Sequence, residues 1–138
     1  MPLVVVTGFP CSGKTRRAQE LADYLRSVGW VVHMHNNESL GIDRNQAYAN
    51  SQAEKVSRGA LKTAVERGIS KTEILIADDL NYIKGYRYEL FCVARAVGTS
   101  MCTIHCDAEP EQIQQFNSTT SAYDDRHIEV IEATVPML

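Results

Sequence analysis

The chain has 138 residues, of which 44% are hydrophobic and 22% are charged, and its formal net charge is -3. These values are typical of one soluble globular domain that is long enough to bury a core. The slight negative charge argues against general attraction to nucleic acid, and no apolar run approaches the roughly 18 residues that a membrane span requires.

Strand and helix patterns alternate from the N-terminus. Met1-Pro2 leads directly into an apolar run at residues 3–7, which predicts a buried strand and no secretory leader. An amphipathic pattern predicts a helix over residues 14–28, ended by Gly29. A second strand is expected at residues 30–35, followed by a polar loop at residues 36–45.

A long helix is expected over residues 46–67, where it would be ended by Gly68. Its predicted apolar stripe consists of Ala49, Ala53, Val56, Ala60, Leu61, Ala64 and Val65. Lys55, Arg58 and Lys62 share another face of this helix, and they form either a solvated surface or a contact with RNA phosphates.

The second half of the chain continues the alternation. The other expected elements are strands at residues 73–77 and 100–106, helices at 86–97 and 109–116, a loop or hinge at 117–123 and a last helix at 124–133. Gly98 would close the first of these helices, and Pro110 fits the first turn of the second. The order predicts one three-layer α/β domain over residues 1–138, with a mainly parallel sheet and helices on both faces.

The stretch GFPCSGKT, after the first strand, matches the phosphate-binding P-loop pattern G-x-x-x-x-G-K-[ST] and makes this a P-loop NTPase fold. Lys14 would reach the β- and γ-phosphates of a nucleotide, and the Thr15 hydroxyl would bind Mg2+. The predicted nucleotide-binding residues are Gly8, Phe9, Pro10, Cys11, Ser12, Gly13, Lys14, Thr15 and Arg16. Because no guanine-reading N/T-K-x-D motif is present, ATP is the expected nucleotide.

A second acidic signal follows the third predicted strand, in the stretch ILIADD. Asp78 is the expected metal-side carboxylate, as in P-loop proteins whose strand ends in an acid that holds the Mg2+ water shell. Asp79 either orients the attacking water or caps the following turn. Lys14, Asp78 and Asp79 are therefore the predicted catalytic set.

Two further stretches follow predicted strands and are candidates for facing the substrate. In DDLNYIKGYRYEL, either the aromatic residues simply pack on the sheet, or Asn81, Lys84 or Arg87 responds to the nucleotide. In NNESLGI, Glu38 is either a base or a solvated loop acid.

The four cysteines and the histidines of the second strand do not predict a metal site. No CxxC pair is present, and Cys102 and Cys106 would lie about 13 Å apart on one strand, too far for a disulfide. His33 and His35 lack partner ligands, which favours a packed or surface role. Cys11 lies near Lys14, as either a small loop residue or a thiol of lowered pKa. Reduced thiols indicate an intracellular protein.

Together, GFPCSGKT, NNESLGI and DDLNYIKGYRYEL resemble the Elongator-associated regulatory ATPase family, the killer-toxin-insensitivity "twelve" proteins, which are related to seryl-tRNA(Sec) kinase. The likeness runs from Met1 to about Asp107. It implies an ATP- and Mg2+-dependent hydrolase that is stimulated by tRNA, binds the Elongator complex and regulates wobble-uridine modification in the cytoplasm and the nucleus. By this likeness, Lys14 and Thr15 have the phosphate and metal roles, and Asp78 the acid role.

The chain departs from the kinase relatives at two places. They are expected to carry an Asp after the second strand, where this chain has Asn37 and Glu38, and a pair of lid arginines, where residues 108–138 contain only Arg126. The family's second, tRNA-binding domain has no counterpart in this length. A nucleotide-driven regulator is therefore the first hypothesis, and a kinase that phosphorylates an RNA-linked or small hydroxyl is the second. Because no arginine is evident as a finger, slow intrinsic turnover is expected.

Overall fold

β1 (Leu3–Gly8) is buried along its whole length and lies between two parallel neighbours, β3 (Ile74–Asp78) and β4 (Met101–Cys106). β2 (Val32–His35) pairs with the outer side of β3, which gives the strand order β2-β3-β1-β4. The computed structural model describes residues 2–120. Within that range the parallel sheet confirms the predicted α/β fold, and the helix predicted at residues 124–133 lies outside it.

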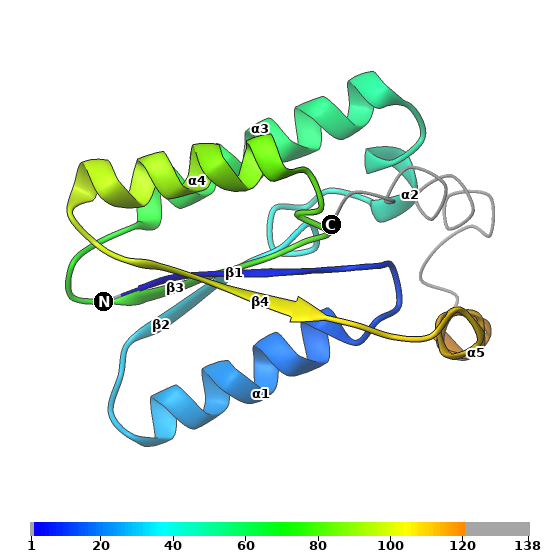
Figure 1. Ribbon diagram of the computed structural model, residues 1–138, viewed down its shortest axis with the longest axis horizontal. Coiled ribbons are helices and arrows are strands. Elements are labelled where there is room, and N and C mark those ends of the chain that lie inside the picture. Colours follow the sequence, from blue (N-terminus) through cyan, green and yellow to red (C-terminus); the bar gives the residue numbers. More distant parts are fainter. Residues whose placement is uncertain (1, 121–138) are drawn as a thin grey trace.

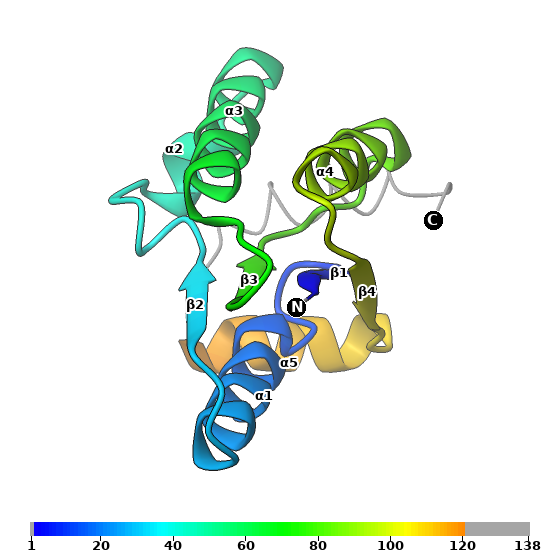
Figure 2. The same cartoon turned by 90° about the vertical axis from the view of Figure 1, so that its left-hand side faces the viewer.

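Helices cover both faces of this sheet (Figures 1 and 2). α3 (Ser51–Gly68) and α4 (Lys84–Val97) lie on one face, and α1 (Lys14–Ser27) and α5 (Pro110–Thr120) lie on the other (Figure 2). Alternate residues of β1 explain why both faces need cover: Leu3 and Val5 pack toward α3 and α4, whereas Val4 and Val6 pack toward α1. A strand buried on both faces reads as a continuous apolar run.

The prediction of one long helix over residues 46–67 is wrong, because the structure has two helices in this region. α2 (Arg44–Ala47) is a single turn, and α3 starts four residues after it ends. Asp43 caps α2 by accepting from the Gln46 amide at 3.0 Å, and Asn50 caps α3 by accepting from the Ala53 amide at 2.8 Å. Side-chain caps of this kind start new helices and so interrupt the longer one.

The predicted apolar stripe of that helix is also partly wrong. Val56 is 62% exposed, and the fully buried line along α3 is Ser57, Leu61 and Val65. The three buried residues are spaced four apart, as expected for one face of a helix. The Ser57 hydroxyl donates to the Asn37 side-chain oxygen at 3.0 Å, so a polar contact occupies the place predicted for an apolar one.

The start of β2 and the end of α5 also differ from the predictions. β2 begins at Val32, and the preceding Trp30 and Val31 are 44% and 52% exposed. α5 continues to Thr120, so the part of the predicted loop at residues 117–120 is helical. Asn117 is buried on α5 and accepts a hydrogen bond from the Cys11 thiol at 3.5 Å, a tertiary contact that holds this polar residue within a helix.

Two smaller expectations are confirmed, one on the end of α4 and one on the cysteines. Gly98 ends α4 with a left-handed φ of 79°. All four cysteines are free. Within residues 2–120, no helix combines the length and the apolar character needed to cross a bilayer.

Candidate nucleotide-binding site

The GFPCSGKT stretch forms a turn between β1 and α1, and its two glycines are required by geometry. A Cβ on Gly8 would lie 2.3 Å from the Cys106 carbonyl oxygen, because β4 passes directly beside the loop. Gly13 has a φ of 84° and caps α1 without any side-chain hydrogen bond. The first turn of α1 therefore presents its backbone N–H groups without a side-chain cap, as helix N-termini that bind phosphate do.

Lys14 is the buried cation of the loop, with only 7% of its surface exposed. Its Nζ donates to the carbonyl oxygen of Phe9, within the same loop. Burial lowers the pKa of Lys14 to about 8, against the attraction of Asp78 and Asp79, which raises it. The ammonium is thus held near the end of β1, and a bound phosphate would add further negative charge and hydrogen-bond acceptors beside it.

Asp78 ends β3 and faces this region as a buried acid. It is 3% exposed, and neither of its carboxylate oxygens has a hydrogen-bond partner among the described residues. Ser12 in the loop also has a buried hydroxyl without a partner in that range. Buried polar atoms of this kind are costly unless something satisfies them. The predicted positions of Lys14, Thr15 and Asp78 around one site are therefore compatible with a bound phosphate and metal.

Asp79, by contrast, makes hydrogen bonds through one of its two carboxylate oxygens. Its Oδ1 accepts hydrogen bonds from the backbone amide of Leu80 at 2.8 Å, from the Tyr48 hydroxyl and, at 3.4 Å, from the side-chain amide of Asn37. Burial raises the pKa of Asp79, and the hydrogen bond from Tyr48 opposes that rise. The bond to Leu80 is the turn contact expected of a cap, and the residue also lines the cleft, so both predicted roles of Asp79 stay open.

These side chains line a narrow cleft of about 20 Å3, enough for roughly one water. Its lining residues are Lys14, Thr15, Asn36, Asn37, Arg44, Asp78 and Asp79. Sequence reasoning missed the two asparagines as lining residues, and it missed Arg44 and Tyr48. The only signal for them was their place after the second strand, where parallel sheets bind ligands.

The predicted sensor residues occupy different surroundings. The Asn81 side chain is buried and donates to the Val6 carbonyl at 2.8 Å and the Ala77 carbonyl at 3.2 Å. Arg87 donates to the carbonyls of Asn81 and Tyr82 at 2.9 and 2.7 Å. Lys84 and Glu38 are exposed. Asn81 and Arg87 thus hold the turn after β3 in shape, and a response to nucleotide by any of these four residues stays a prediction.

The other charged candidates form ordinary surface contacts. On α3, Arg58 pairs with Glu54 at 2.7 Å, and Lys62 pairs with Glu89 of α4 at 2.9 Å. His33 lies 3.0 Å from Glu73. Among residues 2–120, no cluster of three or more His, Cys, Asp or Glu side chains could hold a metal ion. These contacts are those expected of a solvated surface on α3 and of a surface role for His33.

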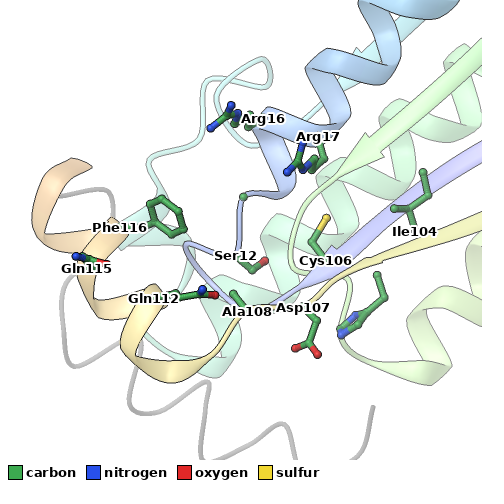
Figure 3. Close-up of a pocket in the computed structure, with 12 residues that line it drawn as sticks. Ser12, Arg16, Arg17, Ile104, Cys106, Asp107, Ala108, Gln112, Gln115 and Phe116 are labelled. Carbon is green, nitrogen blue, oxygen red and sulfur yellow. The ribbon is translucent and has the colours of Figure 1, made fainter.

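A larger pocket of about 630 Å3 opens on the other side of the loop, between the start of α1, the end of β4 and α5 (Figure 3). Its lining residues are Ser12, Gly13, Arg16, Arg17, Ile104, His105, Cys106, Asp107, Ala108, Gln112, Gln115 and Phe116. Of these, sequence reasoning predicted only Ser12, Gly13 and Arg16 as site residues. The helical spacing of Gln112, Gln115 and Phe116 was the available signal for the α5 wall.

The volume suits a nucleoside-sized ligand, since small-molecule pockets span roughly 300–1,000 Å3. Arg16 and Arg17 come from α1, and Phe116, which is 51% exposed, comes from α5 (Figure 3). An arginine and an aromatic ring are both able to stack on a planar base. The loop therefore lies between a narrow polar cleft and a wider pocket that has partly apolar walls.

Comparisons with known proteins agree with this geometry. The family model described as "Chromatin associated protein KTI12" matches residues 1–135. A KTI12 homolog of Xenopus laevis is 46% identical over 135 residues, covering 98% of this chain and 49% of the relative. The KTI12 protein of Saccharomyces cerevisiae is 41% identical over 129 residues, covering 88% of this chain and 41% of the relative. The chain spans about half the length of these curated relatives.

Solved structures extend the comparison to the fold. The crystal structure of Chaetomium thermophilum Kti12 in complex with ADP-AlF3 superposes with a TM-score of 0.83 and 34% identity, covering 93% of this chain and 77% of that chain. The APS kinase of Mycobacterium tuberculosis, in complex with AMPPNP and APS, has a TM-score of 0.65 at 16% identity, covering 84% of this chain and 68% of that chain, a likeness of fold alone. From its matching family model, its curated relatives and this fold, the chain belongs to the KTI12 family.

Proposed function

We propose that this chain binds ATP together with Mg2+ and hydrolyses it. The observation that carries the proposal is Asp78, whose two carboxylate oxygens are buried without a hydrogen-bond partner among residues 2–120. The residue shares its cleft with Lys14 and Thr15 of the phosphate-binding loop. A buried, unpartnered carboxylate is costly, and the water shell of a metal ion would satisfy it. The ADP-AlF3 bound to the solved relative supports a nucleotide at the loop.

Thr15 and Asp78 are the residues that would hold Mg2+. The fit is good because Mg2+ takes only one or two protein oxygens and completes its shell with water and phosphate. Bound there, the ion neutralises charge on the β- and γ-phosphate oxygens. Lys14 would bind the same phosphates through its ammonium, and the first turn of α1 through its N–H groups.

Hydrolysis at this site breaks the bond between the γ-phosphorus and the β–γ bridging oxygen and forms a bond from the water oxygen to the γ-phosphorus. The proton that the water loses ends on the released phosphate. Asp79, fixed by Leu80 and Tyr48, is the carboxylate placed to orient that water. Burial raises the pKa of Asp79, which makes its carboxylate a stronger base when it is ionised.

The wider pocket supplies the place for the base and ribose. Phe116 would stack on the base, and Arg16 and Arg17 would lie at the α1 wall. Adenine is favoured because the sequence lacks the guanine-reading N/T-K-x-D motif.

At the level of the cell, we place this ATPase in the cytoplasm and nucleus as a tRNA-stimulated regulator that works with the Elongator complex on wobble uridines. Membership of the KTI12 family supports this assignment. The tRNA contacts are assigned mainly to the part of the longer relatives that this chain does not span.

Phosphate release from labelled ATP tests the proposal. We would compare the chain with a chimera in which it replaces the matching 135 residues of the Xenopus relative, each with and without bulk tRNA. Slow, Mg2+-dependent release by the chain and faster release by the chimera with tRNA are the expected results. Label transferred to the RNA would instead make the protein a kinase, and no release in any mixture would leave a binding module.

A further inference from the structure

The narrow cleft contains one cation that the P-loop motif does not explain. Of its lining residues, two are basic, Lys14 and Arg44, and two are acidic, Asp78 and Asp79. Lys14 belongs to the motif. Arg44 comes from the segment after the second strand, thirty positions further along the chain, and still lines the same cleft.

The fold fixes the backbone of Arg44 from both sides. Asp43, immediately before it, caps α2 through the Gln46 amide at 3.0 Å. Ala47 at the end of α2 is 3% exposed, and the hydroxyl of the next residue, Tyr48, donates to Asp79. The short helix is therefore attached to the acidic end of β3, and the arginine on its first turn is carried to the site.

We propose that Arg44 contacts the γ-phosphate and stabilises its charge during hydrolysis, as an arginine supplied by the same chain. A guanidinium presents several fixed N–H donors and matches phosphate oxygens better than a lysine does. As the γ-phosphoryl group separates from the bridging oxygen, negative charge accumulates on that oxygen and on the γ-oxygens. A cation placed beforehand at the cleft lowers the barrier because it needs no rearrangement during the reaction.

This inference rests on the proposed function, and it corrects the expectation that no arginine of this chain is placed as a finger. It also gives the segment at residues 36–50 a reason to differ between nucleotide states. ADP has no γ-phosphate, so only ATP would hold Arg44 and the attached α2. The cleft of about 20 Å3 is too small for a γ-phosphate and a metal ion together, so we expect its lining side chains to rearrange when both bind.

Arg44→Ala and Arg44→Lys test the proposal, with Arg67→Ala, an exposed arginine in the last turn of α3, as the matched control. Phosphate release and the affinities for ADP and for a non-hydrolysable ATP analogue would be measured. Arg44→Ala should slow release by about 10²–10³-fold, in the range for loss of one charge-stabilising donor. It should weaken the ATP analogue while leaving ADP affinity unchanged. Arg44→Lys should lie between the two, and Arg67→Ala should match wild type.

Two results would overturn the assignment. One is release by Arg44→Ala at the wild-type rate. The other is an equal loss of ADP and ATP-analogue affinity in both variants, which would show that Arg44 only supports α2. If wild type released no phosphate, the proposed hydrolysis would fail by itself. In that case the two affinities would still test the γ-phosphate contact. The contact would be supported if the Arg44 variants lost the preference for the ATP analogue over ADP, and it would be rejected if that preference were unchanged.

Discussion

The two walls of the narrow cleft are held by different kinds of contact. The phosphate-binding loop is fixed by backbone: the Gly8 amide donates to the Leu80 carbonyl at 3.2 Å, and the Ser12 amide donates to the Phe9 carbonyl at 3.3 Å. The opposite wall, residues 36–50, has backbone turns of its own, such as the Ile42 amide donating to the Asn37 carbonyl at 2.8 Å. It is joined to β3 and α3 by side chains, through the Tyr48–Asp79 and Ser57–Asn37 hydrogen bonds.

The difference bears on function. Backbone contacts constrain the loop whatever side chains surround it, so we expect the loop to keep one conformation when it binds phosphate. Side-chain contacts of the second wall each contribute only about 1–3 kcal/mol and are exchanged individually. We therefore expect the phosphate-binding loop to be the rigid wall and the wall that carries Arg44 and Tyr48 to be the one that responds to nucleotide.

The largest expected effect is that of Asp78, the proposed metal carboxylate, which ends β3 beside the phosphate-binding loop. Asp78→Ala should reduce phosphate release by about 10²–10³-fold, while ATP affinity falls much less, because the metal's help is greatest as charge develops. Thermal stability should not fall, since neither carboxylate oxygen makes a hydrogen bond among the described residues. Phosphate-release assays and thermal melting curves measure both effects, and Asp23→Ala, which changes an exposed acid on α1, is the control. Equal losses of ATP binding and phosphate release would show that Asp78 has a structural role instead.

Next in size is Lys14→Ala, which removes the cation of the rigid wall. Nucleotide affinity should fall roughly 100-fold, as expected for loss of a charge-assisted phosphate contact. The fold should be retained, because burial of this ammonium is unfavourable, as its lowered pKa shows. Titration calorimetry with ATP measures the affinity, and the exposed Lys55→Ala is the control. A Kd equal to wild type would contradict the loop assignment.

A smaller effect is expected from pH. The pKa of Lys14 is lowered to about 8 in the free protein, and a bound phosphate raises it again, so binding takes up a proton above pH 8. Nucleotide affinity should then fall roughly tenfold per pH unit above 8, within the range where the fold persists. For folding the sign is opposite: the unfolded chain keeps this proton between about pH 8 and 10.5, so this group's contribution to stability rises with pH there. Calorimetry in buffers of different ionisation enthalpy measures how many protons are taken up on nucleotide binding. A nucleotide affinity that does not change above pH 8 would contradict this role of Lys14.

The smallest effect should come from one contact of the responsive wall, the Tyr48–Asp79 hydrogen bond. Tyr48→Phe removes the hydroxyl that donates to Asp79, and it should lower the free energy of unfolding by about 1–2 kcal/mol. It should also raise the pKa of Asp79 further, because the hydrogen bond that lowers it is lost. Denaturant unfolding beside Tyr24→Phe, whose ring is 64% exposed, measures the difference. Should both variants unfold alike, the second wall would not depend on this contact.

Sequence reasoning succeeded where local chemistry decides the structure. The β1 run and the GFPCSGKT turn need no distant partner to be recognised, and the acid at the end of β3 follows from strand order. It failed where a contact joins distant residues. Tyr48 and Asp79 are 31 residues apart, and Cys11 and Asn117 are 106 apart, so no local pattern predicts either pair. The helix break was readable in principle, since Asp43 and Asn50 are both good caps.

The close approach of Gly8 to Cys106 has a consequence for how the site is assembled. The two residues are paired in the β1–β4 register, and the Cys106 carbonyl occupies the space beside the loop. Bringing together segments so far apart costs loop-closure entropy, which delays such pairings during folding. We therefore expect the phosphate-binding loop to take its final shape only after β4 has joined the sheet, so that a nascent chain would gain the proposed nucleotide affinity late.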